Sequence, residues 1–303
     1  MKILITGATG LIGTQLTEYL LEDGIKVNYL TTSKEKIENT ENHKGFYWNP
    51  SEGIIDTEAF KEVTTIINLV GATIAKRWTK SYKKTILESR TQTANLIFIT
   101  LKNIDHNVTH FISASGVSVY PSHKNKLYFE TDKEVANTFL GEVVVAWEAA
   151  ADQFETLGLR VAKVRTGVVF SKDEGAFEKI KQPIEKGFGA PLGSGEQWMS
   201  WIHIEDIASL YVHILKNGLS GTYNAVAPNP VTNKNLTFKI AAALQKNIWL
   251  PNVPGFMLKL ILGEMASLLL ESQLVSSKKI EDSGYEFRFV NLNYAIHKLL
   301  KKK

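Results

Sequence analysis

Apolar and polar positions follow two alternating patterns through the first half of the chain. Short continuous apolar runs are typical of parallel strands that are buried on both faces. The runs predicted as strands are 3–5, 26–30, 46–48, 65–70, 110–114 and 159–164. Segments with apolar residues every three or four positions predict helices at 12–20, 80–102 and 140–157. This alternation predicts an α/β fold with a Rossmann-type, doubly wound parallel sheet.

The pattern changes after residue 170. Glycines crowd the stretch 187–195, and the residues from 251 to 300 read as mostly helical. We therefore predict a Rossmann domain and a smaller, mostly helical substrate lobe. The predicted ranges are 1–170 with 200–230 returning to it for the Rossmann domain, and 171–199 with 231–303 for the lobe.

Three glycines stand between the first predicted strand and the first predicted helix. Gly7 permits a sharp turn, Gly10 leaves room for a ligand at the backbone, and Gly13 lets the helix pack close to the strand. The N-terminus of such a helix offers free N–H groups and a positive dipole end to phosphates. The spacing therefore indicates a dinucleotide site, and the alternative is a plain tight strand–helix turn.

The tip of the second predicted strand indicates which nicotinamide cofactor would bind. NAD sites place an acid about 20 residues beyond the glycines to hold the ribose 2′-hydroxyl. This tip carries Thr32, Ser33 and Lys34 instead, and the nearest acid, Glu35, lies among lysines. Hydroxyls and a lysine would hold a 2′-phosphate. We therefore predict NADP over NAD, and the alternative is a neutral surface turn.

Polar residues after later strands are candidates for chemistry. A hydroxyl in the stretch 113–120 could polarise a substrate carbonyl, although serines at a strand end also act as caps. His203 and Asp206 are candidates for acid–base chemistry or for capping the helix that follows them. Both choices stay open at the level of the sequence.

A set of basic and aromatic residues suits an anionic, partly apolar substrate. Its members are Arg77, Trp78, Arg90, Trp198 and Trp201. Exposed tryptophans in a cleft bind flat or apolar groups, whereas buried tryptophans belong to the core. The sequence does not decide between these two roles.

Composition excludes several other classes. The chain of 303 residues has no cysteine, which excludes disulfides and thiolate metal sites, and no metal site is predicted. Part of the net charge of +4 lies in the terminal lysines 301–303, and no aromatic–basic interleaving indicates nucleic-acid binding. The first strand begins at Lys2, and no uninterrupted apolar stretch is long enough to cross a bilayer. We expect a cytoplasmic monomer or homodimer that binds a small molecule and neither nucleic acid nor membrane.

These motifs together carry a family likeness. The stretch 6–13, TGATGLIG, resembles the fingerprint of extended short-chain dehydrogenase/reductases, the NAD(P)-dependent epimerase/dehydratase group. Further stretches narrow the likeness to the epimerase family proteins, also described as nucleoside-diphosphate-sugar epimerases, which carry a C-terminal domain of unknown function, here about 250–299. These stretches are Trp78, 89–90, 113–115, 147–148, 165–167, 193–195, 200–206 and 227–232.

The resemblance implies a set of cofactor and catalytic residues. Ser115 would match the catalytic serine that hydrogen-bonds the reacting oxygen, and Trp48 would lie near the adenine. The residues implied at the pyrophosphate are Gly7, Thr9, Gly10, Leu11, Ile12 and Gly13, and those at the adenosine ribose are Thr32, Ser33 and Lys34. The residues implied along the rest of the cofactor crevice are Leu69, Val70, Gly71, Ser89, Ser113 and Arg165.

The chain departs from the family at the Tyr-x-x-x-Lys pair. In active relatives the tyrosine exchanges a proton with the substrate, and the lysine lowers its pKa. The helix after the serine strand reads FLGEVVVAWE at 139–148 and lacks this pair, which would remove a factor of about 10²–10⁴ in rate unless another group serves. Tyr120 and Glu142 are the nearest candidates by sequence. Two hypotheses follow: an NADP-dependent oxidoreductase or nucleotide-sugar epimerase-like enzyme with a modified acid–base set, or a non-catalytic NADP(H)-binding sensor or scaffold.

Overall fold

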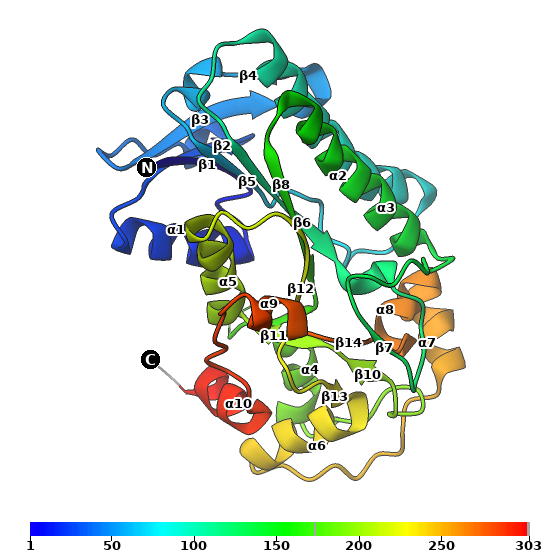
Figure 1. The fold of residues 1–303 in the computed structure, drawn as a ribbon. Coiled ribbons are helices and arrows are strands. Elements are labelled where there is room, and N and C mark those ends of the chain that lie inside the picture. Colours follow the sequence, from blue (N-terminus) through cyan, green and yellow to red (C-terminus); the bar gives the residue numbers. More distant parts are fainter. Residues whose placement is uncertain (173, 302–303) are drawn as a thin grey trace.

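The computed structural model describes residues 1–172 and 174–301 and is built around one eight-stranded sheet (Figure 1). The strands are β1 (Lys2–Thr6), β2 (Lys26–Thr31), β3 (His43–Asn49), β4 (Ile54–Ile55), β5 (Thr65–Asn68), β6 (His110–Gly116), β8 (Arg160–Thr166) and β12 (Gly221–Ala225). Their order is β12-β8-β6-β5-β1-β2-β3-β4, and only β3 and β4 pair in antiparallel fashion. The predicted doubly wound parallel sheet is confirmed.

Helices cover both faces of this sheet (Figure 1). They are α1 (Leu11–Glu22), α2 (Lys80–Asn103), α3 (Phe139–Asp152) and α5 (Ile204–Lys216). α1 packs against α5, and α2 packs against α3. Successive strand residues point to opposite faces, so Ile3 and Ile5 join the core under α1 and α5 whereas Leu4 joins the core under α2 and α3. Burial on both faces explains why these strands are continuous apolar runs.

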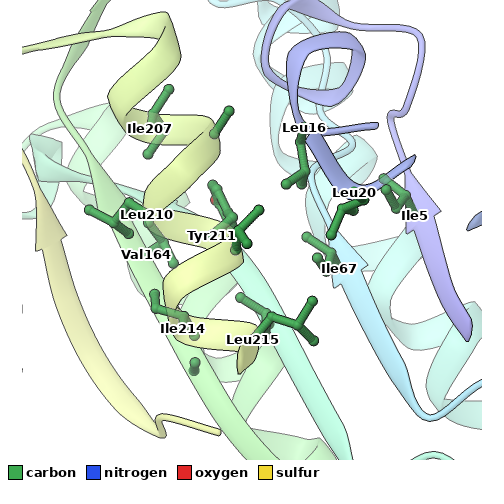
Figure 2. Packing of buried hydrophobic residues seen from close by; sticks show 14 of the residues in the cluster. Ile5, Leu16, Leu20, Ile67, Val164, Ile207, Leu210, Tyr211, Ile214 and Leu215 are labelled. Atoms are coloured by element: carbon green, nitrogen blue, oxygen red, sulfur yellow. The ribbon is translucent and has the colours of Figure 1, made fainter. Parts of the chain in front are cut away.

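The core beneath α1 fixes the end of β1. In Figure 2, Leu16 and Leu20 of α1 lie beside Ile5 and Ile67 of the sheet, and Tyr211 points from α5 toward the same region. All five side chains are buried, and none is more than 1% exposed. Burying one such aliphatic side chain contributes about 1.5–3 kcal/mol. The packing therefore holds α1 firmly against the strand from which the glycine loop leaves.

The remaining elements form a mostly helical lobe at one edge of the sheet (Figure 1). Its helices are α4 (Ala176–Glu185), α6 (Asn233–Ala243), α7 (Gly255–Leu262), α8 (Ser267–Leu270), α9 (Lys278–Asp282) and α10 (Leu292–Leu300). Its two-stranded pairs are β9 (Val168–Phe170) with β11 (Trp201–His203), β10 (Trp198–Met199) with β13 (Val231–Thr232), and β7 (Leu127–Tyr128) with β14 (Leu274–Val275). α4, α6 and α10 enclose a separate apolar core that includes Phe177, Leu236 and Ile296.

Some boundaries differ from the expectation. The predicted helix 140–157 is α3 followed by the 3₁₀ turn Gln153–Leu157, and other 3₁₀ turns lie at Lys34–Lys36, Pro50–Glu52, Thr57–Phe60, Val117–Val119 and Gly263–Ala266. The chain returns to the main sheet after the first lobe segment, because α5 packs on α1 and β12 pairs with β8. Among residues 1–172 and 174–301, no helix combines the length and apolarity that a bilayer crossing requires.

Candidate active site

The glycine loop joins β1 to α1 with very little free space. Gly7 has a φ of +73°, which is the left-handed conformation that glycine adopts at low cost. A Cβ on Gly13 would lie 2.1 Å from the carbonyl oxygen of Gly7, so only glycine fits there. By contrast, a Cβ on Gly10 would meet only that same oxygen at 3.3 Å, and Gly10 is exposed. The loop is tight on the protein side and open at Gly10.

The N-terminus of α1 has no side-chain cap. Three other helices have a threonine at the N-cap, and each threonine side chain accepts a hydrogen bond from a backbone N–H of the first turn. These residues are Thr79 at α2, Thr138 at α3 and Thr232 at α6. At α1 the N-cap is Gly10, which makes no side-chain bond. This helix end lies between β1 and β5, where the strand order reverses and doubly wound sheets bind ligands. Its amides and dipole are therefore available to an anion.

The loop after β5 forms the opposite wall of this crevice. The hydroxyl of Thr6 donates to Asn68 Oδ1 at 2.6 Å and accepts from the Val70 N–H at 3.4 Å. The Ala72 N–H donates to Ser89 Oγ at 2.9 Å. These contacts fix the loop that contains Leu69, Val70 and Gly71, and they give Ser89 a positioning role.

Arg90 supports the same loop from below. Its Nη1 donates to the carbonyls of Ile86 at 2.9 Å and Ala72 at 3.2 Å, and its guanidinium lies 4.8 Å from the ring of Trp147. Only 9% of the residue is exposed, and burial lowers the pKa of the guanidinium to about 10. A Cβ on Gly71 would lie 2.9 Å from Arg90 Cζ. The structure therefore corrects the prediction that Arg90 contacts an anionic substrate, because its guanidinium is buried against the loop.

The tip of β2 is held in one conformation by its own hydroxyls. Thr31 Oγ1 accepts from the Ser33 N–H at 3.2 Å, while Thr32 and Lys34 are exposed. Lys34 Nζ lies 4.8 Å above the ring of Tyr47. A hydrogen bond from Ser33 lowers the pKa of Glu35, the exposed acid that follows Lys34.

Ser115 lies at the carboxyl end of β6 and is hydrogen-bonded to Glu148, which the sequence placed in the family likeness but not among the candidate catalytic groups. Its Oγ donates to Glu148 Oε1 at 2.6 Å, and Arg165 clamps Glu148 through Nε at 2.7 Å and Nη2 at 2.8 Å. Ser115 and Arg165 are register partners on β6 and β8. Burial raises the pKa of Glu148, but the hydrogen bond and charge of Arg165 lower it more, so this carboxyl is ionised. Arg165 is thus a partner of Glu148.

Tyr120 is a buried member of the same network. Its hydroxyl accepts from Arg165 Nη1 at 2.9 Å and donates to Asn224 Oδ1 at 2.8 Å. The side chain is fully buried, and burial raises the pKa of the phenol. The prediction that Tyr120 is a catalytic acid is corrected, because its only proton is committed to Asn224 and a ligand cannot reach it.

Glu142 is not part of this network. It is exposed in the first turn of α3, and Glu148 lies six residues later, about 240° further around the helix. The two acids therefore face different directions, and it is Glu148, not the predicted Glu142, that contacts Ser115. A sequence signal existed, because Glu148 is the one charged residue in the stretch 143–151, and a lone acid in an apolar helix needs a buried partner.

Of the four tryptophans among the candidate binding residues, two are buried in the core and two are half-buried. Trp48 is 1% exposed within the core under α2 and α3, and Trp201 is 0% exposed and stacks on Phe170. These two rings pack the interior, which corrects their predicted contacts with adenine and substrate. Trp78 and Trp198 are half-buried, and each indole N–H donates to a loop carbonyl at 2.9 Å.

Among the other candidates, Arg77 and Thr9 are exposed, Leu11 and Ile12 are half-buried, and Ser113 is buried. The Ser113 hydroxyl donates to the Ala114 carbonyl at 3.0 Å. The two serines of this stretch therefore differ: Ser113 bonds the neighbouring backbone, whereas Ser115 faces an acid.

His203 and Asp206 hold the structure together. Nδ1 of His203 accepts from the Glu205 N–H at 3.1 Å, which caps α5, and burial lowers the pKa of the ring to about 3. The carboxylate of Asp206 accepts from the backbone N–H groups of Arg288 at 2.9 Å and Phe289 at 3.0 Å. His203 thus matches the capping alternative, whereas the Asp206 side chain bonds the C-terminal segment and not the first turn of α5.

An uncapped glycine-loop helix at the switch point of a doubly wound sheet defines a Rossmann-type, NAD(P)-binding class of protein. Comparison with known proteins makes the assignment specific. A model of the NAD dependent epimerase/dehydratase family matches residues 3–225, and a domain of unknown function (DUF1731) matches 253–299. The chain belongs to the NAD-dependent epimerase/dehydratase family.

Similar proteins share the full length of the chain. An epimerase family protein of Staphylococcus aureus strain MRSA252 is 35% identical over 304 residues, covering 99% of both chains. The crystal structure of a human epimerase family protein with NADPH superimposes with a TM-score of 0.86 at 28% identity, again covering 99% of both chains. A nucleoside-diphosphate sugar epimerase from Corynebacterium glutamicum has a TM-score of 0.78 at 28% identity and covers 99% of this chain and 58% of its own.

Proposed function

We propose that this protein is an NADP-dependent oxidoreductase or nucleotide-sugar epimerase-like enzyme in which Ser115, together with Glu148, forms a modified acid–base set without the Tyr-x-x-x-Lys pair. The observation that carries the proposal is the open N-terminus of α1 at Gly10. The human relative was solved with NADPH, which supports the same cofactor here. The localisation that fits such an enzyme is the cytoplasm.

The chain's own residues suit a dinucleotide. The amides around Gly10, including those of Leu11, Ile12 and Gly13, would hold the pyrophosphate, because no side chain caps this helix end in the described chain. Thr32, Ser33 and Lys34 would hold the 2′-phosphate, and the loop at Leu69, Val70 and Gly71 would line the crevice. When bound, the cofactor would supply hydride acceptance and donation at its nicotinamide.

Ser115 would contact the reacting oxygen of the substrate. Glu148 orients its hydroxyl, and Arg165 keeps Glu148 ionised. The exposed Arg77 and the half-buried Trp78 and Trp198 suit a small substrate with an anionic, partly apolar body, such as a sugar nucleotide.

Calorimetry with NADPH, NADP⁺ and NADH tests the cofactor part of this proposal. We expect NADPH to bind more tightly than NADH, and we expect a screen of alcohols, carbonyls and sugar nucleotides to reveal a substrate that changes the nicotinamide absorbance. Absence of binding to every nicotinamide cofactor would overturn the proposal. Binding without turnover across the screen would remove the enzymatic part alone.

Lys34→Ala is expected to weaken NADPH by about five- to thirty-fold, because it removes one charge-assisted contact worth roughly 1–2 kcal/mol from a 2′-phosphate. NADH has no such phosphate, so its affinity should stay within about twofold. Glu35→Gln is the matched control: removing a carboxylate beside Ser33 should leave NADPH binding unchanged or tighter. If Lys34→Ala weakened NADPH and NADH by the same factor, Lys34 would not be the residue that contacts the 2′-phosphate.

A second function is favoured by one observation. Arg165 holds Glu148 as a carboxylate, which makes this acid a weak proton acceptor, and the chain lacks the tyrosine–lysine pair. A non-catalytic NADP(H) sensor or scaffold would fit that chemistry. A sensor must bind NADP⁺ and NADPH with different affinities. A ligand that binds two conformations of the protein equally well does not shift the balance between them. Equal affinities in the calorimetry would exclude sensing.

A further inference from the structure

Hydrogen bonds around Ser115 assign the position of its only proton. Ionised Glu148 can accept but not donate, and its Oε1 accepts from Ser115 at 2.6 Å and from Arg165 Nε at 2.7 Å. A hydroxyl has one proton and two acceptor lone pairs. Ser115 therefore spends its proton on Glu148 and presents only lone pairs to any other group.

Further hydrogen bonds hold the Arg165 guanidinium in place against Glu148. Its Nη2 donates to Glu148 Oε2 at 2.8 Å, and its Nη1 donates to the Tyr120 hydroxyl at 2.9 Å. Tyr120 is fixed in turn by Asn224 Oδ1 at 2.8 Å, and Asn224 Nδ2 donates to the Ser276 carbonyl at 3.1 Å. The clamp thus extends from β6 through α3 and β8 to β12 and the C-terminal domain.

The other charged groups near Glu148 and near Tyr120 are already engaged. Lys163 on β8 pairs with Asp152 of α3 at 2.6 Å, and Glu130 accepts from the Asn224 N–H at 2.8 Å. The side chains of Glu148 and Arg165 are 12% and 11% exposed, and Ser115 is 4% exposed as a residue. So little exposed surface leaves contact with at most one small group of a ligand, such as a single hydroxyl.

We infer that Ser115 acts as a hydrogen-bond acceptor, so that the site selects a ligand that offers a hydroxyl over the same ligand with a carbonyl at that position. Arg165 and Tyr120 are the positioning residues that enforce this choice. A carbonyl has no proton to give, and it would face the lone pairs of Ser115 without a donor. The inference rests on the proposed function, because it names the substrate class of the same site.

Titration of the Glu148 carboxyl by ¹³C NMR in the cofactor-free protein tests the proton assignment. Ser115→Ala is expected to raise the pKa of Glu148, because the donated hydrogen bond favours the charged form. Ser113→Ala, which removes a hydroxyl on the same strand that donates to a backbone carbonyl instead, should leave that pKa unchanged. An unmoved pKa in Ser115→Ala would overturn the inference. Tyr120→Phe, which keeps the ring, should raise the pKa as well if Tyr120 positions Arg165.

A matched pair of probes tests the choice of ligand. We expect cyclohexanol to give stronger saturation-transfer NMR signals than cyclohexanone with the NADP⁺-loaded protein, and we expect Ser115→Ala to abolish the difference. Equal or stronger signals from the ketone, or none from either probe, would contradict selection of a hydroxyl. Loss of NADP⁺ binding itself would be seen first by calorimetry and would count against the proposed function, whereas the carboxyl titration tests Ser115 without any cofactor.

Discussion

Gly13→Ala is expected to abolish measurable NADPH binding and to lower the free energy of unfolding by about 1–3 kcal/mol. The added Cβ would lie 2.1 Å from the Gly7 carbonyl oxygen and 2.7 Å from Ala8 Cα, and both are backbone atoms that cannot rotate away. Relief requires α1 to move off β1, and that movement displaces the amides that would hold the pyrophosphate. Calorimetry with NADPH and urea unfolding measure the two effects.

Gly10→Ala is the matched control for the same loop. Its Cβ would meet one protein atom, the Gly7 carbonyl oxygen, at 3.3 Å, and Gly10 has a negative φ of −93°. The unfolding free energy should therefore stay within about 0.5 kcal/mol of the wild-type value. NADPH affinity should still fall, because the methyl group projects into the open side of the loop. Wild-type affinity in Gly13→Ala would refute the placement of the cofactor at this helix.

Arg165→Met is expected to destabilise the protein by about 3–5 kcal/mol at neutral pH, because it leaves Glu148 as a buried charge without its partner. In the wild-type protein the pKa of Glu148 is lowered, so its contribution to stability is present above the unfolded-state pKa and is lost as pH falls through the folded-state pKa. In the variant the lowering by Arg165 is lost, burial outweighs the smaller lowering by Ser115 and Lys163, and the pKa of Glu148 should rise. The difference between the two proteins should therefore shrink as pH falls, which urea unfolding at several pH values measures.

The double variant Glu148→Gln/Arg165→Met controls for lost packing. Gln keeps the size of Glu148 and can still accept the Ser115 proton, but it carries no charge that needs compensation. We expect it to recover part of the stability lost in Arg165→Met and to remove the added pH dependence. Strictly additive losses would show that Arg165 acts by packing and not by its charge.

The fold was predictable because its signals are local. The continuous apolar runs of β1, β5 and β6 follow from burial on both faces of the sheet. The glycine loop was also readable, since its spacing between strand and helix has a single backbone explanation. These features depend on residues within a few positions of one another.

The active-site network was less predictable because its members lie far apart in the chain. Ser115 and Glu148 are 33 residues apart, and Tyr120 and Asn224 are 104 apart, yet each pair shares a hydrogen bond. Proximity in sequence favoured Glu142 and Tyr120 as catalytic groups, whereas helix phase turns Glu142 to solvent and burial removes Tyr120. The same holds for Trp48 and Trp201, whose burial depends on elements that pack over them.

By itself, the order of residues determined the parallel sheet, the helices on its faces and the loop that opens α1 to an anion, because each arises from periodicity and backbone geometry over short stretches. Only the tertiary structure decided that Glu148 accepts the hydrogen bond of Ser115, that Arg165 keeps this acid charged, and that the buried Arg90 supports the loop after β5. Those roles depend on burial and on which strand ends meet, and the packing of distant segments sets both.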